Sequence, residues 1–303
     1  MWCTRIDTAG SVDDAARKMH AESQHTIRGL LSATTPWLEK RGSPSARLDT
    51  ELIIGHALSK RRLDLYLDLD RVLTDDELAA CRAMVKRRGG GEPIAYILGY
   101  REFYGQRFAV SPAVLIPRPD TERLVELALD LLPDDSGTII DIGTGSGCVA
   151  LSILMNREDV RAVAVDISPA AIAVAKQNAE ALGVADRIDF RVGDLLAPCD
   201  DVVDAVMIVS NPPYIRRDAP DLAADVKAFE PELALFGIDA DALGHHRRIL
   251  AAAPKHLVVD GKVLMEIGHD QGRAARSLLV PPFASVNIEL DLDGRDRVAV
   301  FGR

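Results

Sequence analysis

Apolar residues recur every three or four positions in the first third of the chain, which is the spacing of one face of a helix. Three such faces cover residues 27–38, 48–58 and 78–85. No alternating pattern interrupts them, so we expect residues 27 to about 98 to form a small helical bundle. Residues 1–20 are polar and weakly patterned, and we expect a frayed or loose helix there.

Charged residues lie where they would complement the dipoles of these helices. Asp49 and Glu51 come early in the second helix, where the dipole favours acids. Lys86, Arg87 and Arg88 end the third helix, and three glycines follow. We interpret this basic run as compensation of the C-terminal dipole rather than as a contact surface.

The pattern changes after residue 98. Residues 103–110 indicate a short hairpin around Gly105. Pro117 and Pro119 then predict a stiff, non-helical linker, and Thr121 begins an amphipathic helix.

Further along, apolar runs typical of strands alternate with helical patterns, which predicts an α/β class with a doubly wound, mostly parallel sheet. Helices are expected from Val149, over residues 168–182 and over residues 242–253. The last two strands are separated only by a turn at Gly294, so we expect them to pair antiparallel. The expected strands cover residues 138–142, 160–165, 187–192, 202–209, 262–267, 286–290 and 297–301.

A glycine-rich loop joins the first of these strands to its helix. Glycines at 143, 145 and 147 permit positive φ and close approach of a ligand to the backbone, and the helix N-terminus favours negative charge. The dinucleotide fingerprint would require glycine where Cys148 stands. The pattern D-x-G-x-G-x-G, which begins at Asp141, instead resembles motif I of the class I S-adenosylmethionine-dependent methyltransferases.

Two carboxylates end the next two strands. Asp166 follows the second strand, where an acid accepts hydrogen bonds from ribose hydroxyls in a doubly wound fold. Asp194 ends the third strand, within reach of an adenine edge. Together with the glycine loop, these residues predict a nucleoside-binding crevice at the carboxyl ends of adjacent strands.

The fourth strand ends in Asn211-Pro212-Pro213-Tyr214. Proline lacks an N–H and extends the residue before it, so the segment offers carbonyl acceptors with few competing donors. Tyr214 adds a flat face. These features suit a planar group that bears –NH₂, either a carboxamide or the exocyclic amine of a base.

Composition narrows the possible functions. The 303 residues suffice for two domains. The formal net charge of −10 argues mildly against a protein that binds the phosphate backbone of nucleic acids. No apolar run is long enough to cross a membrane, and the N-terminus lacks a signal-peptide pattern. The four cysteines form no C-x-x-C pair, and His245 and His246 fit no metal-binding pattern, so we expect no metal and a reducing cytoplasm. We interpret both histidines as surface residues of a helix.

Longer stretches resemble the HemK/PrmC family of release-factor glutamine methyltransferases. The resemblance extends over roughly residues 25–303, and the Pro-Arg-Pro-Asp-Thr-Glu stretch with the helical N-terminal region makes it specific. The matching stretches lie at residues 87–99, 116–122, 141–147, 210–215, 229–231, 266–268 and 296–297.

The resemblance implies a fold and an activity. It implies a helical substrate-recognition domain at residues 1–98, a β-hairpin linker at residues 99–117, and a seven-stranded class I methyltransferase domain at residues 118–303. The expected reaction moves a methyl group from S-adenosyl-L-methionine to the side-chain amide nitrogen of the glutamine in the Gly-Gly-Gln loop of class 1 peptide release factors. S-adenosyl-L-homocysteine is the expected product. The expected partner is the release factor, without membrane or direct nucleic-acid binding.

The resemblance also assigns residues. Asn211, Pro212 and Tyr214 would be catalytic, and these three with Pro213 would hold the glutamine amide. Leu195 is aliphatic where some relatives carry an aromatic residue, and residues 1–25 have no family counterpart. The expected cofactor-binding residues are Gly143, Thr144, Gly145, Ser146, Gly147, Asp166, Asp194, Leu195 and Asn211.

Two other functions are compatible with the same motifs. Asn-Pro-Pro-Tyr also serves methylation of adenine N6 in nucleic acids, but that requires base flipping and a basic DNA-facing region, which the acidic chain does not obviously offer. A non-catalytic cofactor-binding or scaffolding protein is the other alternative, and the intact Asn211 and glycine loop argue against it.

Overall fold

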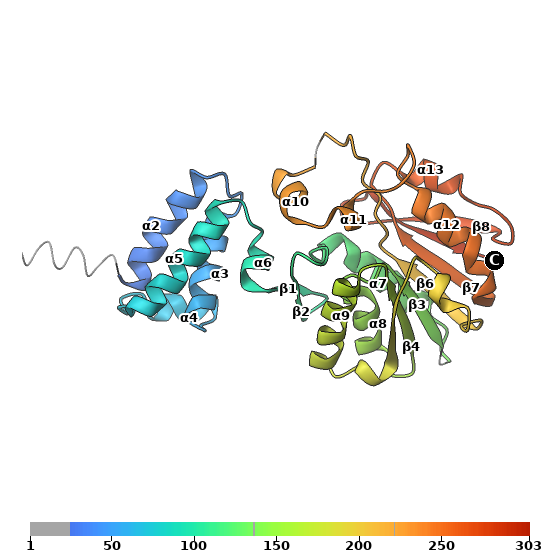
Figure 1. Cartoon of the computed structure of the whole chain (residues 1–303), viewed down its shortest axis with the longest axis horizontal. Coiled ribbons are helices and arrows are strands. Elements are labelled where there is room, and N and C mark those ends of the chain that lie inside the picture. The colour runs from blue at the N-terminus through green and yellow to red at the C-terminus, as the bar shows by residue number, and fades with distance from the viewer. Residues whose placement is uncertain (1–24, 136, 221) are drawn as a thin grey trace, which may run out of the picture. The chain divides into compact units, whose positions relative to one another are not determined.

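The computed structural model describes residues 25–135, 137–220 and 222–303, so the loose helix expected within residues 1–20 lies outside the described part. The chain divides into two compact units, and the boundary in the sequence falls between Leu98 and Gly99. The described part of the N-terminal unit is helical, and the C-terminal unit carries the sheets (Figure 1).

The N-terminal unit confirms the helical bundle expected from the apolar spacing. Thr26 caps the first helix by accepting the N–H of Gly29, and Thr74 with Glu77 forms a capping box on α5. A core of Ile27, Ile54, Leu65, Leu73, Leu78 and Cys81 holds the helices together. The helices are α2 (Ile27–Glu39), α3 (Ala46–Ala57), α4 (Arg62–Leu67), α5 (Asp75–Gly89) and α6 (Ile94–Leu98).

One buried ion pair in this unit differs from the expectation of simple dipole compensation. Arg88 donates from Nε to Asp49 at 2.6 Å, and both side chains are buried. Ser43 and Ser45 also donate to Asp49. Arg88, at the end of α5, therefore joins this helix to α3 through a residue 39 positions earlier in the sequence.

The C-terminal unit begins with the expected hairpin. Strands β1 (Tyr100–Phe103) and β2 (Gln106–Ala109) pair antiparallel, with Gly105 at φ +73° in the turn. The 3₁₀ helix η1 (Pro119–Thr121) begins at the second of the two prolines, so the segment expected to be non-helical is helical at its end, and it leads into α7 (Glu122–Leu131).

Seven strands form the main sheet in the order β5-β4-β3-β6-β7-β9-β8. The first five in that order run parallel, whereas β9 lies antiparallel between β7 and β8. This topology confirms the expected doubly wound sheet and the antiparallel pairing of the last two strands. The strands are β3 (Thr138–Ile142), β4 (Arg161–Asp166), β5 (Ile188–Val192), β6 (Ala205–Ser210), β7 (Leu257–Glu266), β8 (Ser285–Leu290) and β9 (Asp296–Gly302).

Helices cover both faces of this sheet (Figure 1). Ile139 packs in the apolar cluster that contains α7 and α8, whereas Ile140 and Ile142 pack in the cluster that contains α12. Alternate side chains of a strand point to opposite faces, which explains why β3 reads as a continuous apolar run. The remaining helices are α8 (Cys148–Asn156), α9 (Pro169–Ala181), η2 (Ala185–Arg187), η3 (Ala197–Cys199), α10 (Ala224–Phe229), α11 (Glu232–Leu235), α12 (Gly244–Ala252), η4 (Ala253–Lys255) and α13 (Gly272–Arg276).

Candidate functional site

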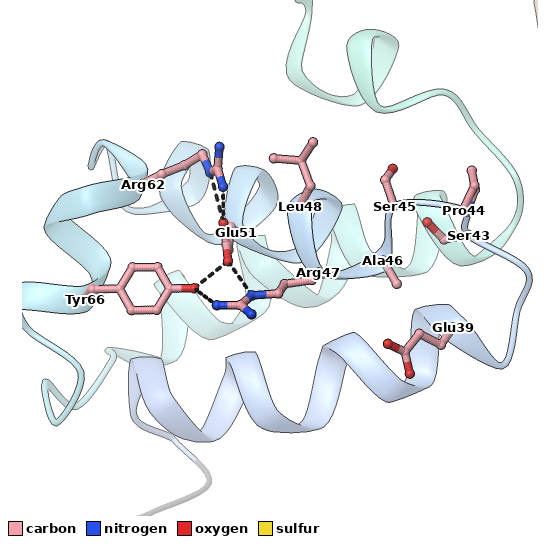
Figure 2. Close-up of a pocket in the computed structure, with 10 residues that line it drawn as sticks. All are labelled: Glu39, Ser43, Pro44, Ser45, Ala46, Arg47, Leu48, Glu51, Arg62 and Tyr66. Carbon is pink, nitrogen blue, oxygen red and sulfur yellow. Dashed lines mark hydrogen bonds and ion pairs between the residues drawn. The ribbon is translucent and has the colours of Figure 1, made fainter.

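A hollow of about 580 Å³ lies in the N-terminal unit, with the carboxylate of Glu51 beside it. Figure 2 shows Glu51 bonded to Arg47, Arg62 and Tyr66, with Nε–O distances of 3.1 Å for Arg47 and 2.9 Å for Arg62. Both carboxylate oxygens therefore already have donors. This carboxylate has a structural role, because its hydrogen-bonding capacity is used within the unit.

The second cavity has the chemistry expected of a ligand site. Its volume is about 420 Å³, within the range of small-molecule pockets, and it lies in the C-terminal unit. Residues at or just after the ends of β3, β4 and β6 line it, as expected for an open α/β sheet. Its polar lining includes Arg118, Thr121, Asp141, Thr144, Ser146, Asp166, Ser168, Asp194, Asn211, Arg217, Glu232 and His245.

The glycine loop takes the conformation that only glycine adopts freely. Gly143, Gly145 and Gly147 have φ values of +70°, +57° and +82°. Gly147 is the N-cap of α8, and a Cβ there would lie 2.8 Å from Cδ1 of Leu151. A side chain at this position would therefore strain the backbone and clash with the helix.

Asp166 ties the loop to the end of β4. Its Oδ2 accepts the N–H of Gly145 at 2.9 Å, and its Oδ1 accepts the N–H of Ser168 at 2.9 Å. Burial raises the pKa of Asp166, and these backbone donors oppose that shift. Each carboxylate oxygen keeps a further lone pair, so the group can still accept a ligand hydroxyl.

A second buried carboxylate lies under the loop. Asp141 accepts the hydroxyl of Thr144 at 2.7 Å and is 1% exposed. Burial raises its pKa to about 6, while the bonds from Thr144 and from the N–H of Ala150 act in the opposite direction. Asp141 therefore helps to hold the loop through its bond to Thr144.

The structure places Asp194 and Leu195 on the lining of the cavity. Asp194 forms an ion pair with Arg248 of α12, a partner that the sequence did not indicate. Leu195 has φ +50°, an uncommon value for a branched side chain.

The segment after β6 is divided between the cavity and the interior. Asn211 and Pro213 line the cavity, whereas Pro212 is buried and neither it nor Tyr214 is among the lining residues. The hydroxyl of Tyr214 donates to Oε1 of Glu266 at 2.8 Å, and burial raises the pKa of this phenol. In the described part of the chain, no donor bonds to the carbonyl oxygens of Asn211, Pro212 or Pro213.

The wall formed by residues 231–238 was not predicted from the sequence as part of the site. Leu233 and Phe236 supply apolar lining, and Arg217 stacks over Phe236 with 5.0 Å between the guanidinium carbon and the ring centre. Ile215 pairs with this segment through the N–H bond to Leu235 at 3.0 Å. The motif Phe-Glu-Pro at residues 229–231 was the only sequence signal for this wall.

The interpretation of the adjacent histidines as surface residues is wrong. His246 is fully buried, and its Nε2 lies 2.9 Å from the carbonyl oxygen of Glu266. Burial lowers its pKa to about 4. His245 is half-buried and lines the cavity. His246 lies on the side of α12 that is buried, together with Ile249 and Leu250. The apolar pattern of this helix is too weak to have predicted which side is buried.

Among the described residues, no group of three or more metal-ligating side chains has the geometry to hold a metal ion. Within the same part of the chain, no helix is long and apolar enough to span a membrane.

Comparison with known proteins relates both units to one kind of protein. The family model described as the PrmC N-terminal domain matches residues 29–99, and the model described as the methyltransferase small domain matches residues 122–230. A relative from Nitratidesulfovibrio vulgaris, named release factor glutamine methyltransferase, is 40% identical over 285 residues, which is 93% of this chain and 96% of that protein. A relative of the same name from Cereibacter sphaeroides is 41% identical over 270 residues, covering 88% of this chain and 95% of the other.

Solved structures share the fold at lower identity. The catalytic domain of hMettl16, in complex with MAT2A 3′UTR hairpin 6, aligns with a TM-score of 0.53 at 17% identity. The alignment covers 77% of this chain and 84% of that chain. At this identity it supports only a shared fold.

Proposed function

The chain belongs to the release factor glutamine methyltransferases, and from this premise we propose that it methylates the side-chain amide nitrogen of the glutamine in the Gly-Gly-Gln loop of a class 1 peptide release factor. The methyl donor is S-adenosyl-L-methionine, and S-adenosyl-L-homocysteine is the product. The observation that carries the proposal is Asn211, an amide side chain on the lining of the cavity formed by the glycine loop and Asp166.

The residues around the cavity fit this cofactor. Asp166 retains lone pairs for the ribose hydroxyls, and residues 143–147 bring backbone close to the cavity. Asp194 and Leu195 are proposed to flank the adenine, since both line the cavity after β5. When bound, the cofactor supplies a methyl group already activated by its sulfonium, so the protein has mainly to orient and stabilise.

Asn211 does the stabilising in this proposal. An amide nitrogen is a poor nucleophile, because its lone pair is delocalised into the carbonyl. As that nitrogen forms its new bond to carbon, its N–H groups become more acidic and donate more strongly. The hydrogen bond from this N–H to an acceptor such as Oδ1 of Asn211 then becomes stronger by about 1.5–3 kcal/mol as charge develops.

The rest of the segment supports the same acceptor set. We assign the carbonyl group of Pro213 to the glutamine amide, because Pro213 lines the cavity and no donor in the described part of the chain competes for this oxygen. Pro212 is buried and does not line the cavity, so its role in this proposal is to keep Asn211 extended. Tyr214 stabilises the position of residues 211–214 through the hydrogen bond from its hydroxyl to Glu266.

The division of labour between the units belongs to the same proposal. Residues 1–98 recognise the release factor, and residues 118–303 carry out the methyl transfer. Residues 99–117 connect these two domains. The protein acts in the cytoplasm, where release factors work, and binds no nucleic acid directly.

The test is transfer of labelled methyl from S-adenosyl-L-methionine to three acceptors. These are a purified class 1 release factor, the same factor with Gln→Ala in its Gly-Gly-Gln loop, and duplex DNA. Label on the intact factor alone supports the proposal. Label on DNA would favour methylation of adenine N6 instead.

A further inference from the structure

Tyr214 is held at two points by the turn that follows β7. Its hydroxyl donates to Oε1 of Glu266, the last residue of β7, at 2.8 Å. Its backbone carbonyl oxygen accepts Nε2 of Gln271 at 3.1 Å. Gln271 precedes α13 and is 8% exposed, so water has little access to this bond. Two separate hydrogen bonds therefore fix the residue that ends the Asn-Pro-Pro-Tyr segment.

The side-chain amide of Gln271 makes three hydrogen bonds, which leave it one orientation. Its Oε1 accepts the N–H of Gly268 at 2.8 Å, and its Nε2 also donates to the carbonyl oxygen of Asp241 at 3.0 Å. A reversed amide would place its NH₂ against an N–H and its oxygen against two carbonyl groups. A Cβ at Gly268 would lie 3.0 Å from Oε1, so glycine leaves room for this close contact.

Residues 211–214 are stiff enough to transmit this restraint to Asn211. The two prolines between Asn211 and Tyr214 have fixed φ angles, and each residue before a proline is extended. At the other end, Ser210 belongs to β6, and its hydroxyl donates to the carbonyl oxygen of Ile142 at 2.7 Å. The segment is thus anchored at both ends, and a displacement of Tyr214 would reach Asn211.

The bond from Gln271 to Asp241 reaches a wall of the cavity. Asp241 lies between the wall of residues 231–238 and α12, which contributes His245 to the cavity lining. The carboxylate of Asp241 also accepts the N–H of Leu243 at 3.2 Å, which orders the chain just before α12. Gln271 therefore connects residues 211–214 to this wall as well as to the turn after β7.

We propose that Gln271 is a positioning residue for methyl transfer, which fixes the carbonyl group of Tyr214 and thereby the place of Asn211 beside the substrate amide. Gln271 is itself not among the described residues that line the cavity, so it acts through these two residues. Its role rests on the proposed transfer to a glutamine side chain. It adds to that reaction a residue 60 positions after Asn211 in the sequence.

Two substitutions remove the proposed restraint in different ways. Gln271→Met keeps the length of the side chain and loses all three bonds, whereas Gln271→Glu keeps an acceptor for Gly268 and loses both donors. We expect each to lower kcat roughly 10- to 100-fold, because a misplacement of about 1 Å costs this much. The Kd for S-adenosyl-L-homocysteine should stay within about twofold, since none of the three bonds reaches the glycine loop or Asp166.

Arg187→Ala is the matched control for lost hydrogen bonds. Its guanidinium donates to the carbonyl oxygens of Leu154 and Arg157, each at 2.8 Å, and of Val160 at 3.4 Å. These groups precede β4, whereas the cavity lies at the carboxyl ends of the strands. Arg187→Ala should therefore lower stability and leave kcat and the cofactor Kd within about twofold, at a temperature where the variants are folded.

Three kinetic results would overturn the proposal. The first is an unchanged kcat in both Gln271 variants. The second is an equal fall of kcat in Arg187→Ala, which would attribute the loss to lower stability. The third is a Kd for S-adenosyl-L-homocysteine that rises as much as kcat falls, because a positioning role predicts a loss in transfer alone.

Crystal structures give a readout that does not depend on catalysis. In a Gln271 variant, the carbonyl group of Tyr214 and the side chain of Asn211 should be displaced by about 1 Å, while residues 143–147 superpose on the original protein. Unmoved positions of Tyr214 and Asn211 would contradict the proposal. Absence of methyl transfer by the original protein would count against the proposed function instead, and these structures would still decide the role of Gln271.

Discussion

The carboxylate of Glu230 accepts the backbone N–H of Ile116 at 3.0 Å, although the two residues are 114 positions apart in sequence. Its other oxygen is paired with Arg118, and the side chain of Glu230 is 1% exposed. Glu230, which lies between the short helices α10 and α11, thus bonds to the segment that precedes η1. Both of these segments contribute to the lining of the cavity.

Loss of the bonds from Ile116 and Arg118 to Glu230 should destabilise the C-terminal unit. Glu230→Ala leaves a buried N–H without an acceptor and Arg118 without its partner, which costs about 2–4 kcal/mol in the free energy of unfolding. Glu230→Gln keeps an acceptor for Ile116, so its loss should be smaller. Denaturant unfolding of both variants checks this, and equal stability of the Ala variant and the original protein would refute it.

Asn211→Ala should separate binding from transfer. We expect cofactor affinity to stay within a few-fold and kcat to fall about 10²- to 10³-fold, because the acceptor acts on charge that develops during transfer. Asn287→Ala, on the exposed side of β8, is the matched control and should leave both unchanged. Unchanged turnover in Asn211→Ala would remove this residue from the proposed chemistry.

Asp166→Asn should weaken cofactor binding. The change removes the charge that strengthens hydrogen bonds from ribose hydroxyls, and it turns one acceptor into a donor that faces a backbone N–H. We expect a Kd for S-adenosyl-L-methionine about 10- to 100-fold higher by calorimetry. Asp204→Asn, an exposed acid before β6, is the control. A Kd in Asp166→Asn equal to that of the control would refute the assignment.

Asp141 should leave a signature in the pH dependence of stability. Burial raises its pKa to about 6 in the folded protein, above the value of about 4 in an unfolded chain. The folded state then holds the proton more tightly, so this group's contribution to stability is complete below about pH 4 and is lost as the pH rises through about 6. Asp141→Asn should flatten this part of the profile of unfolding free energy. Parallel profiles for the two proteins would contradict the prediction.

Leu195→Phe tests the proposed adenine contact. An aromatic ring would stack on the base and gain about 0.5–1.5 kcal/mol, or roughly a two- to tenfold lower Kd for the cofactor. Leu292→Phe, at a fully exposed position, is the control. No tightening in Leu195→Phe beyond the control would argue that adenine lies elsewhere.

Much of this architecture follows from local pattern. Asp141, the glycine loop and Asp166 could be placed together from sequence, because the carboxyl ends of neighbouring parallel strands meet at one edge of a sheet. The β-branched run of β3 and the turn at Gly294 likewise determine structure within a few residues of themselves.

Other features depend on partners that are distant in sequence. The burial of His246 depends on the sheet behind α12, and the bond between Asp49 and Arg88 on the packing of α3 against α5. Tyr214 was expected to offer a flat face, whereas its hydroxyl is held by Glu266 from β7. Periodicity and spacing carry no information about such pairings, so these contacts could not be predicted from the sequence pattern.

In the proposed reaction, the methyl group is placed on one glutamine side chain. The most direct measurement is tandem mass spectrometry of a class 1 release factor after reaction with this protein and S-adenosyl-L-methionine. We expect one added methyl group on the side-chain nitrogen of the glutamine in the Gly-Gly-Gln loop, and no added methyl group when Asn211→Ala replaces the original protein. A methyl group on any other residue, or an unmodified glutamine after reaction with the active protein, would contradict it.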